Sequence, residues 1–511
     1  MLAKVLSGAN VGLEARSIAV EVDIAMQGLP SFTIVGLGDR AVEESKERVR
    51  SAIRNSGADF PARKITVNLA PADLPKEGPA YDLPIALGLL IASGQIPQKN
   101  EFVDLENTLV VGELSLDGSL RKTAGVLPMA ILAKKTGIKT IIVPLLNGQE
   151  AAVIEGVRVF AFTNLQDIIK VFLQQAEAVP IEKVAIDFET ESEREGDFAQ
   201  VKGQEQAKRA LEIAAAGGHN ILLKGPPGAG KTMLARAFSS IMPPLSFEES
   251  LEVTSIYSIT GMLEKDQPLI TSRPFRTPHH TASYVGMVGG GASVRPGEIS
   301  LAHRGVLFLD ELPEFPRQVL ESLRQPMEDH KITISRASGS LTFPAQFLLL
   351  AAQNPCPCGF LGDSKHQCSC MPGSIAKYQR RLSGPLLDRI DIYLEVPAVE
   401  VEKLADLKEA ESSKAIRDRV IKARKIQSER FTGKILTNAE MGSLEIRQFC
   451  QITAEGLDLL KRAISSLNLS ARGYHRVLKL SRTIADLAES ENILTEHVAE
   501  ALQYRSRDET S

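Results

Sequence analysis

The alternation of apolar and polar positions divides the N-terminal third of the chain into strands and helices. An amphipathic run predicts a helix at residues 41–57. Shorter apolar or alternating runs predict strands at 18–24, 32–35, 65–69 and 139–143. We expect the last of these strands, followed by Pro144, to close the block. This alternation of elements indicates a mixed α/β fold for residues 1 to about 175.

The rest of the chain divides into a linker, a second mixed block and a helical block. Residues 187–197 are rich in acidic and poor in large apolar side chains, which is typical of a solvated linker. We expect that linker at 176–199; a binding tail is the alternative. The second block covers 200–398. The last block, 399–511, is expected to be helical, with one helix at 413–431 whose apolar face carries Ile416, Val420 and Ala423.

Length and composition limit the classes of protein that fit. A chain of 511 residues is too long for one hydrophobic core, so about two to four domains are expected. No apolar run approaches the ~20 residues that span a bilayer, and the N-terminus has no apolar stretch typical of a secretory signal. The net charge of −4 argues against a passive nucleic-acid coat but allows local basic surfaces. Clustered cysteines favour a reducing compartment, the cytoplasm.

A glycine-rich segment carries the strongest chemical signal in the chain. An apolar run at 220–224 predicts a strand before it, and apolar side chains at helical spacing (Leu234, Phe238 and Ile241) predict a helix after it. A P-loop needs this setting, because its glycines wrap a phosphate and the helix start directs amide groups at it. A glycine turn without a ligand is the alternative. The segment comprises Gly225, Pro226, Pro227, Gly228, Ala229, Gly230, Lys231 and Thr232.

The P-loop predicts ATP and Mg²⁺ as cofactors and requires partners from other strands. Lys231 is expected to neutralise the β- and γ-phosphates, and the Thr232 hydroxyl to reach Mg²⁺. The apolar run at 306–309 ends in Asp310 and Glu311. At the carboxyl end of a parallel strand, Asp310 would hold Mg²⁺ through its water shell and Glu311 would accept a proton from the attacking water. Two carboxylates that only cap the strand are the alternative.

A third apolar run also ends in a polar side chain. The run at 347–352 is followed by Gln353 and Asn354. Asn354 at that strand end is expected to orient the attacking water or contact the γ-phosphate. A turn-forming asparagine before Pro355 is the alternative.

These motifs together resemble the AAA+ ATPases. The order P-loop, Leu-Phe-Leu-Asp-Glu, Ala-Ala-Gln-Asn and Gly-Pro-Leu-Leu-Asp-Arg is similar to their magnesium-chelatase-like branch. Long strings at 67–78, 296–311 and 354–359 are similar to the ComM/YifB family. The resemblance covers nearly the whole chain. It implies a central P-loop αβα sandwich with a helix-2 insert and a pre-sensor hairpin, followed by a C-terminal helical lid.

The resemblance also implies an arginine that acts between subunits and a sensor arginine in the lid. Arg389 matches the arginine finger, which acts on the nucleotide of the neighbouring subunit; an ion pair with Asp388 or Asp391 is the alternative. Arg472 is the candidate for the second sensor arginine in the lid, with Arg476 as the alternative. A finger supplied by a neighbour requires a ring, so the family implies a homo-hexamer.

A hairpin is expected at 331–343, since apolar and polar residues alternate on both sides of a turn at 336–340. In related helicases a hairpin at this place projects into the channel of the ring, and the insert at 279–300 accompanies it. Lys331, Arg336 and Arg295 would then contact DNA phosphates without reading sequence. Packing of the hairpin against the neighbouring subunit is the alternative.

Cysteine and histidine pairs suggest further sites. Four cysteines satisfy tetrahedral Zn²⁺, although Cys-x-Cys spacing is tighter than usual, and unmetallated thiols or a redox pair remain open. His366 would be able to replace one thiolate, and Cys450 is expected in the core. The adjacent His279 and His280 are expected to point in opposite directions on an extended segment and to be hydrogen-bonded structural residues. The four cysteines are Cys356, Cys358, Cys368 and Cys370.

Residues 109–121 and 137–144 are similar to the proteolytic domain of Lon proteases, which implies a ribosomal-protein-S5 domain-2-like α+β fold. Lon proteases use a Ser–Lys dyad, whereas here Gly78-Pro79 is followed by Ala80, which has no nucleophile. The region of the catalytic lysine, 125–130, contains no lysine. We therefore expect no peptidase activity. We expect this N-terminal domain instead to shape the ring entrance, select substrate or bind a partner.

The expected function is that of a ring-forming ATPase that moves on DNA. The family resemblance implies branch migration of recombination intermediates during natural transformation, on single-stranded and branched DNA and alongside recombination proteins. A protein-remodelling or chelatase-type motor that acts on a protein partner is the alternative. The chain lacks the Asp-x-Ser-x-Ser string of the chelatase partner subunits.

Overall fold

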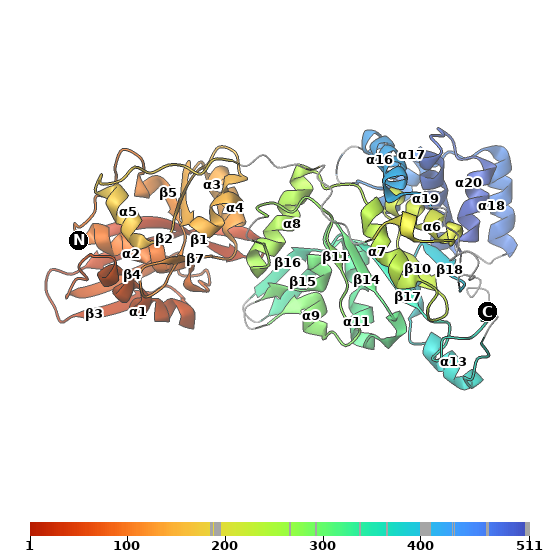
Figure 1. Ribbon diagram of the computed structural model, residues 1–511, viewed down its shortest axis with the longest axis horizontal. Helices are drawn as coiled ribbons and strands as arrows, with labels where there is room; N and C mark the ends of the chain where they lie inside the picture. Colours follow the sequence, from red (N-terminus) through yellow and green to blue (C-terminus); the bar gives the residue numbers. More distant parts are fainter. Residues whose placement is uncertain are drawn as a thin grey trace.

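The computed structural model describes most of the chain, and Figure 1 shows its layout. The acidic stretch at 187–197 lies mainly outside the described residues. Among the residues that are described, no helix is long and apolar enough to cross a membrane. The described residues are 1–183, 188, 196–264, 267–291, 294–336, 339–363, 366–398, 410–431, 433, 435–466 and 470–505.

The N-terminal part is built on a seven-stranded mixed sheet, in the order β3-β4-β2-β1-β5-β8-β9. The pairs β1–β2 and β2–β4 are antiparallel, and the other neighbours are parallel. The strands are β1 (Leu2–Val11), β2 (Glu14–Ile24), β3 (Ser31–Val35), β4 (Lys64–Ala70), β5 (Thr108–Val110), β8 (Thr140–Pro144) and β9 (Arg158–Phe162), with the small pair β6 (Glu113–Leu114) and β7 (Leu120–Arg121).

Five helices cover this sheet. The almost wholly apolar α2 packs on β1 and β2 and is buried along nearly its whole length, which explains why it shows no polar face. In contrast, α1 is amphipathic and is capped by Asp39, whose carboxylate accepts a 2.9 Å bond from the Val42 amide. The helices are α1 (Arg40–Asn55), α2 (Asp82–Ala92), α3 (Val126–Thr136), α4 (Gly148–Ala152) and α5 (Leu165–Phe172).

The sequence predicted most of these elements, with one error. The strands expected at 18–24, 32–35 and 65–69 and the helix at 41–57 are present. The expectation that the strand at 139–143 closes the block is wrong, because β9 pairs with β8 at the edge of the sheet and α5 follows it. Four of the five residues of β9 are apolar, but Pro144 at the end of β8 favours an end of the block at that point.

The second sheet is parallel throughout and has the order β11-β14-β17-β10-β18. The strand β10 lies between β17 and β18, and its Ile221, Leu222 and Leu223 are buried. Because parallel strands end at the same edge, the segments that follow β10, β14 and β17 meet there. The strands are β10 (Ile221–Lys224), β11 (Phe275–Arg276), β14 (Val306–Leu309), β17 (Leu348–Gln353) and β18 (Ile392–Glu395).

Helices and an insert surround this sheet. The insert contains α9 (Tyr284–Val288), β12 (Gly289–Gly290), β13 (Arg295–Pro296) and α10 (Glu298–Leu301). The hairpin expected at 331–343 is present, but its strands continue to Arg336 and Gly339, so the turn is shorter than expected. The hairpin consists of β15 (Lys331–Arg336) and β16 (Gly339–Pro344); the helices are α6 (Glu205–Gly217), α7 (Lys231–Ile241), α8 (Phe247–Thr260), α11 (Arg317–Ser322), α12 (Arg324–Asp329), α13 (Pro372–Gln379) and α14 (Gly384–Leu387).

The C-terminal part is helical, as expected, and packs beside α6 and α7. In α16 the predicted apolar face, Ile416, Val420 and Ala423, is buried. Cys450 is also buried, as predicted. The helices are α16 (Ser413–Arg430), α17 (Ser443–Phe449), α18 (Ala454–Ser466), α19 (Ala471–Leu487) and α20 (Thr495–Gln503).

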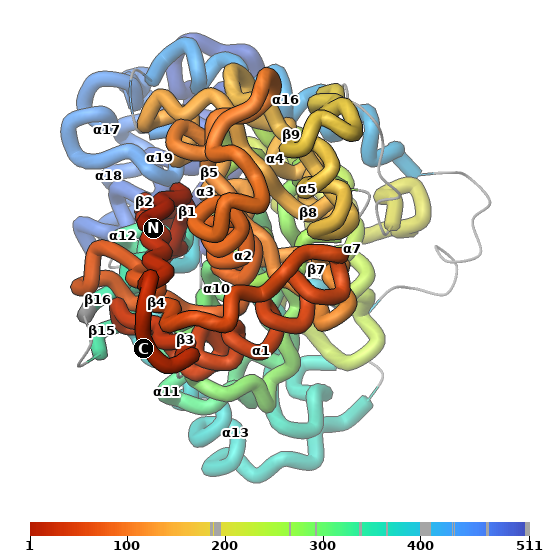
Figure 2. The backbone as a smooth tube through the Cα atoms, turned by 90° about the vertical axis from the view of Figure 1, so that its left-hand side faces the viewer, coloured from red at the N-terminus to blue at the C-terminus, as the bar shows by residue number. Residues whose placement is uncertain are grey.

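The N-terminal part docks on α8 through buried polar bonds. The Gly125 amide donates a 2.9 Å bond to the Ser258 carbonyl, and the Ser258 hydroxyl donates a 2.5 Å bond to the buried carboxylate of Glu150. The Lys122 ammonium donates to the Leu263 carbonyl. Viewed along the long axis, the N-terminal part, drawn in red and orange, stands in front of the rest of the chain (Figure 2). These bonds join the two parts through α8.

Candidate nucleotide site and cysteine cluster

The P-loop connects β10 to α7 and depends on its glycines. A side chain at Gly225 would place its Cβ 2.1 Å from the Val396 carbonyl oxygen, which no residue with a Cβ tolerates. Gly230 has a φ of 85° directly before α7 begins at Lys231. The loop therefore turns tightly and presents the start of α7, the geometry that binds phosphate.

Lys231 lies inside this loop rather than in solvent. Its Nζ donates to the carbonyls of Gly225 at 2.7 Å and Pro226 at 2.9 Å and to Asn354 Oδ1 at 3.1 Å. Burial lowers the pKa of the Lys231 ammonium, while the charges of Asp310 and Glu311 oppose that change. Lys231 in the P-loop is thus hydrogen-bonded to Asn354, the residue after β17. The sequence predicted that these two residues meet, because each follows a strand of the same parallel sheet.

The carboxylate pair after β14 lies beside the P-loop threonine. The Thr232 hydroxyl donates a 2.8 Å bond to Asp310 Oδ2, and Asp310 Oδ1 accepts the Glu311 amide at 2.9 Å. The Glu311 side chain is half exposed, and its Oε2 lies 3.2 Å from His280 Nδ1. A hydroxyl and a carboxylate at this separation offer the hard oxygen ligands that Mg²⁺ prefers, so these residues fit that ion.

The prediction that His279 and His280 point in opposite directions is wrong. Their ring centroids are 4.1 Å apart, because the segment makes a turn, closed by the bond from the Ala282 amide to the His279 carbonyl, instead of running extended. Both are held by polar neighbours, as predicted: His279 contacts the Thr281 hydroxyl, and His280 contacts Glu311. The His280–Glu311 contact was not expected, since the two residues lie far apart in the sequence.

The candidate arginines lie at the opposite end of the sheet. The side-chain Nδ2 of Asn220, directly before β10, donates a 3.0 Å bond to the Arg389 carbonyl, whereas the P-loop follows β10. Four strand residues separate the two ends by roughly 13 Å. The Arg389 guanidinium pairs with Glu328 and the Pro385 carbonyl, not with Asp388 or Asp391. Arg389 is therefore distant from the P-loop of its own chain.

The two lid arginines share this location. Arg476 is buried and donates a 2.8 Å bond to the Ile390 carbonyl, with its Nη2 3.6 Å from Asp388 Oδ1. Arg472 is exposed, and its Nη1 lies 4.0 Å from Asp388 Oδ2. Together with Arg389 they line a cavity of about 350 Å³ between the sheet and the helical part. These three arginines form what we call the arginine face, which lies apart from the edge of the sheet that carries the P-loop.

The predicted DNA residues are exposed, and two of them, Arg336 and Arg295, lie where the hairpin tip meets the insert. Arg336 Nη2 lies 3.4 Å from the position that a Cβ on Gly290 would occupy, so the hairpin tip meets the strand pair of the insert. Arg295 stands opposite Gly290 in that pair. Among the described residues, Lys331, Arg336 and Arg295 have no ion-pair partner. At the base of the hairpin, Ile332 and Phe343 are buried.

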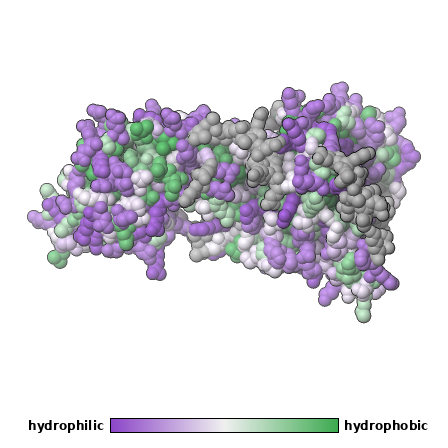
Figure 3. Space-filling model, viewed as in Figure 1, coloured by the Kyte–Doolittle hydropathy of each residue, from purple (hydrophilic) through white to green (hydrophobic). Residues whose placement is uncertain are grey.

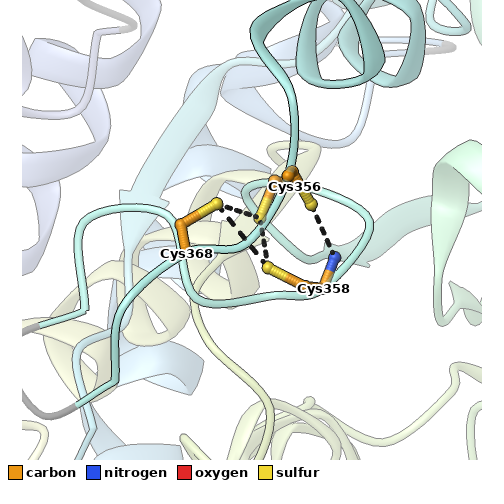
Figure 4. Close-up of side chains that lie close together, drawn as sticks. Cys356, Cys358 and Cys368 are labelled. Carbon is orange, nitrogen blue, oxygen red and sulfur yellow. Dashed lines mark hydrogen bonds between the residues drawn. The ribbon is translucent and has the colours of Figure 1, made fainter.

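The four cysteines gather in one loop, as their spacing predicts (Figure 4). The sulfurs of Cys356, Cys358 and Cys368 lie 3.4 to 3.7 Å apart, and all four sulfurs are within 4.8 Å of one another with no disulfide. Tetrahedral zinc with bonds of ~2.3 Å holds its sulfurs about 3.8 Å apart, so the four residues fit this ion. His366 lies outside the group and contacts Asp363 instead.

One contributor to the nucleotide site was missed by the sequence reasoning. The Tyr378 hydroxyl in α13 contacts the backbone of Asn354, and burial raises its pKa to about 12. Three residues further on, Arg381 Nη1 lies 2.6 Å from Glu314 Oε2. The sequence gives no sign that Tyr378 belongs to the nucleotide site, because its contact with Asn354 depends on how α13 packs.

This geometry defines an AAA+ P-loop protein, and comparison with known proteins identifies the branch. Patterns of the families described as "Magnesium chelatase, subunit ChlI", "Subunit ChlI of Mg-chelatase" and "Magnesium chelatase, subunit ChlI C-terminal" match residues 197–404, 20–147 and 410–505.

Full-length relatives narrow the assignment. The chain is 44% identical to "Competence protein ComM" of Haemophilus influenzae, over 99% of this chain and 97% of that protein. It is 46% identical to YifB of Escherichia coli, over 98% and 96%. A shorter match, 30% identical, covers 24% of this chain and 22% of "Lon protease 2" of Bacillus subtilis. The chain therefore belongs to the ComM/YifB family of magnesium-chelatase-like AAA+ proteins.

Proposed function

We propose that this protein is a ring-forming, ATP-driven DNA motor that moves the branch point of recombination intermediates. The observation that carries the proposal is the placement of Lys231, Asp310 and Asn354 at one end of the sheet and of the candidate arginines at the other, together with exposed basic side chains on the hairpin. The near full-length similarity to a protein named for competence supports a role in natural transformation.

ATP hydrolysis would use the residues gathered at the strand ends. Lys231 exchanges its Gly225, Pro226 and Asn354 acceptors for phosphate oxygens. When bound between Thr232 and Asp310, Mg²⁺ supplies positive charge to the phosphate oxygens. Glu311 takes the proton of the attacking water, and Asn354 orients that water. Contact with His280 places a hydrogen-bond partner beside the Glu311 carboxylate.

A ring, which we propose to be a hexamer, would complete each site. Arg389 and Arg472 are too far from their own P-loop to contact its nucleotide, which supports a role on the neighbour's triphosphate, with Arg476 as the alternative to Arg472. Glu328 and Asp388 then hold these arginines until a neighbour docks. A charge supplied in this way is worth ~10³–10⁵ in rate in related nucleotide hydrolases.

DNA would pass through the channel along the hairpins and inserts. Lys331, Arg336 and Arg295 form no ion pair with any residue that the structure describes, and in a ring their positive charges would repeat around one axis. On the face shown in Figure 3 hydrophilic residues predominate. Because the whole chain carries a net charge of −4, attraction of DNA would depend on basic side chains gathered in the channel rather than on the overall charge. Binding of this kind is sequence-independent and weakens with salt.

Two further assignments belong to the proposal. The four cysteines would hold one structural Zn²⁺, for which the reducing cytoplasm keeps the thiols available. We also propose the division 1–175, 176–199, 200–398 and 399–511, in which the first domain guides partners such as recombination proteins to the ring. Its Ala80 lies where Lon proteases carry their nucleophile.

ATP hydrolysis and branch migration, measured side by side on four-way, forked and single-stranded DNA, test the proposal. We expect DNA to stimulate hydrolysis and ATP to drive movement of the four-way junction. The second candidate is a protein-remodelling motor, favoured by 25% identity to the "Magnesium-chelatase 38 kDa subunit" of Cereibacter sphaeroides over 31% of this chain. Hydrolysis that ignores every DNA but responds to a protein partner would select that candidate.

A further inference from the structure

The cysteine loop touches the P-loop directly. Gly359, the residue after Cys358, has a φ of 86°, and a Cβ there would lie 2.4 Å from Pro227 Cδ and 2.6 Å from Pro227 Cγ. Only a glycine backbone therefore fits against the proline ring. The Gly359 amide donates a 3.0 Å bond to the Cys356 carbonyl. The glycine that meets the P-loop is therefore hydrogen-bonded to the first cysteine and directly follows the second.

The other end of the same segment returns to the nucleotide site. After Cys370 the chain enters α13, where Tyr378 contacts the Asn354 backbone. Gln379 Nε2 lies 3.5 Å from the Pro355 carbonyl, and Arg381 pairs with Glu314, three residues after Glu311. Residues 356–381 thus contact the P-loop, the end of β17 and the segment after β14.

The described residues of this loop are held by local contacts and by the cysteines, without regular secondary structure. Between Cys356 and Met371 the described residues form no helix or strand. Their backbone is tied by isolated turn bonds, such as that from the Asp363 amide to the Phe360 carbonyl. The four sulfurs join the two ends of the loop, and no disulfide links them. A soft divalent cation bound by them would be the cross-link that fixes the position of Gly359.

We propose that the ion held by the four cysteines tightens nucleotide binding. It would do so by holding Gly359 in contact with Pro227, which fixes the position of that part of the P-loop. This inference rests on the proposed ATP and zinc sites and adds a link between them. Zinc would act here as a positioning ion, since the cysteine loop meets the P-loop at Pro227 through Gly359, the residue that follows Cys358. Loss of the ion frees Pro227 and weakens binding before any effect on the chemical step.

Two glycines of this loop provide a matched pair of variants. Gly359→Ala and Gly362→Ala both place a methyl group at a positive φ, 86° and 79° respectively. The Cβ at 359 meets Pro227, whereas the Cβ at 362 has no neighbour within 4 Å. Backbone strain is therefore alike in the two variants, and only the first disturbs the P-loop contact. Neither variant removes a cysteine.

The experiment measures bound zinc by mass spectrometry and the Kd of a fluorescent ATP analogue for the full-length protein. We expect one zinc per chain in both glycine variants, a Kd raised about tenfold or more for Gly359→Ala, and a near wild-type Kd for Gly362→Ala. Cys368→Ser should lose the zinc and raise the Kd in the same direction.

Equal Kd values for the two glycine variants, or unchanged nucleotide binding in zinc-free Cys368→Ser protein, would overturn the inference. Wild-type protein that carries no zinc or binds no nucleotide would instead overturn the assignments on which it rests, so the two failures are distinguishable. A chelator titration of wild-type protein supplies the same comparison without a substitution. There the Kd should rise as zinc leaves and recover when zinc is returned.

Discussion

The Lys231 ammonium donates a 3.1 Å hydrogen bond to the side-chain oxygen of Asn354, which follows a neighbouring strand of the same sheet. When ATP binds, Lys231 must exchange this bond for a phosphate oxygen, which frees Asn354. We therefore expect Lys231 to act in ATP binding and Asn354 in the later hydrolysis step. Lys231→Ala should abolish nucleotide binding and hydrolysis. Asn354→Ala should bind ATP but hydrolyse it about 10²-fold more slowly, as when one preorganised polar group is lost. Binding and single-turnover assays separate the two, and equal loss of binding in both would contradict the assignment.

Glu311 is the expected general base. Glu311→Gln keeps the size of the side chain but cannot accept the proton, so the turnover rate should fall about 10²- to 10⁴-fold while ATP still binds. Glu321→Gln on the nearby helix α11 is the control, since Glu321 pairs with Arg324 rather than facing the P-loop. Rapid-quench hydrolysis with radiolabelled ATP measures the difference. A Glu311→Gln protein that turns over normally would remove Glu311 from the mechanism.

The hairpin is expected to move DNA without being needed for hydrolysis. Arg336→Ala should spare basal hydrolysis and impair unwinding and branch migration, because a phosphate contact is lost at every position of the ring. Arg40→Ala is the control, as its side chain is 93% exposed on α1. Fluorescent four-way junctions report the rate. Normal unwinding by Arg336→Ala would show that the hairpin serves another purpose.

The Glu150–Ser258 bond should hold the N-terminal part on α8. Ser258→Ala removes one of the donors to a buried carboxylate and should destabilise the protein by about 1–3 kcal/mol. Thermal unfolding and amide hydrogen exchange at α3 and α8 measure the effect. Ser239→Ala, which removes only a bond to the Arg236 carbonyl within α7, should change stability much less. Equal shifts in both variants would contradict a coupling role for Ser258.

Glu150 also predicts a pH dependence. Burial raises the pKa of its carboxyl, opposed by bonds from Ser258, Asn147 and the Leu127 amide. The folded protein therefore binds this proton more tightly than the unfolded chain does. The resulting stabilisation is complete below the ordinary glutamate value of about 4.3 and is lost as pH rises through the higher folded value. Glu150→Gln should flatten this part of the melting-temperature profile; an unchanged profile would contradict it.

The sequence was sufficient where function depends on local motifs at strand ends. The P-loop, Asp310, Glu311 and Asn354 each follow an apolar run, and parallel strands bring such ends together whatever the loops between them do. The hairpin followed from its alternation, and its register then placed Arg336 at the tip. Cysteine spacing was enough to predict that the four sulfurs gather.

Contacts between distant segments were beyond such reasoning. The sequence carries no sign that Gly359 covers Pro227 or that Ser258 bonds to Glu150, because each contact depends on how whole elements pack. The His279–His280 error had a local cause: an extended segment was assumed where the chain turns. The strand β9 was missed although four of its five residues are apolar, because Pro144 at the end of its partner β8 favours an end of the block there.

Mixing two inactive variants tests the shared site most directly. Lys231→Ala lacks the phosphate-binding lysine, and Arg389→Ala lacks the residue that we assign to the neighbour's nucleotide. Each variant alone should show almost no DNA-stimulated ATP hydrolysis. An equimolar mixture should regain part of the wild-type rate, because Arg389 of one subunit then faces an intact P-loop in the next. A mixture as inactive as its components, although mixed rings form, would contradict the account.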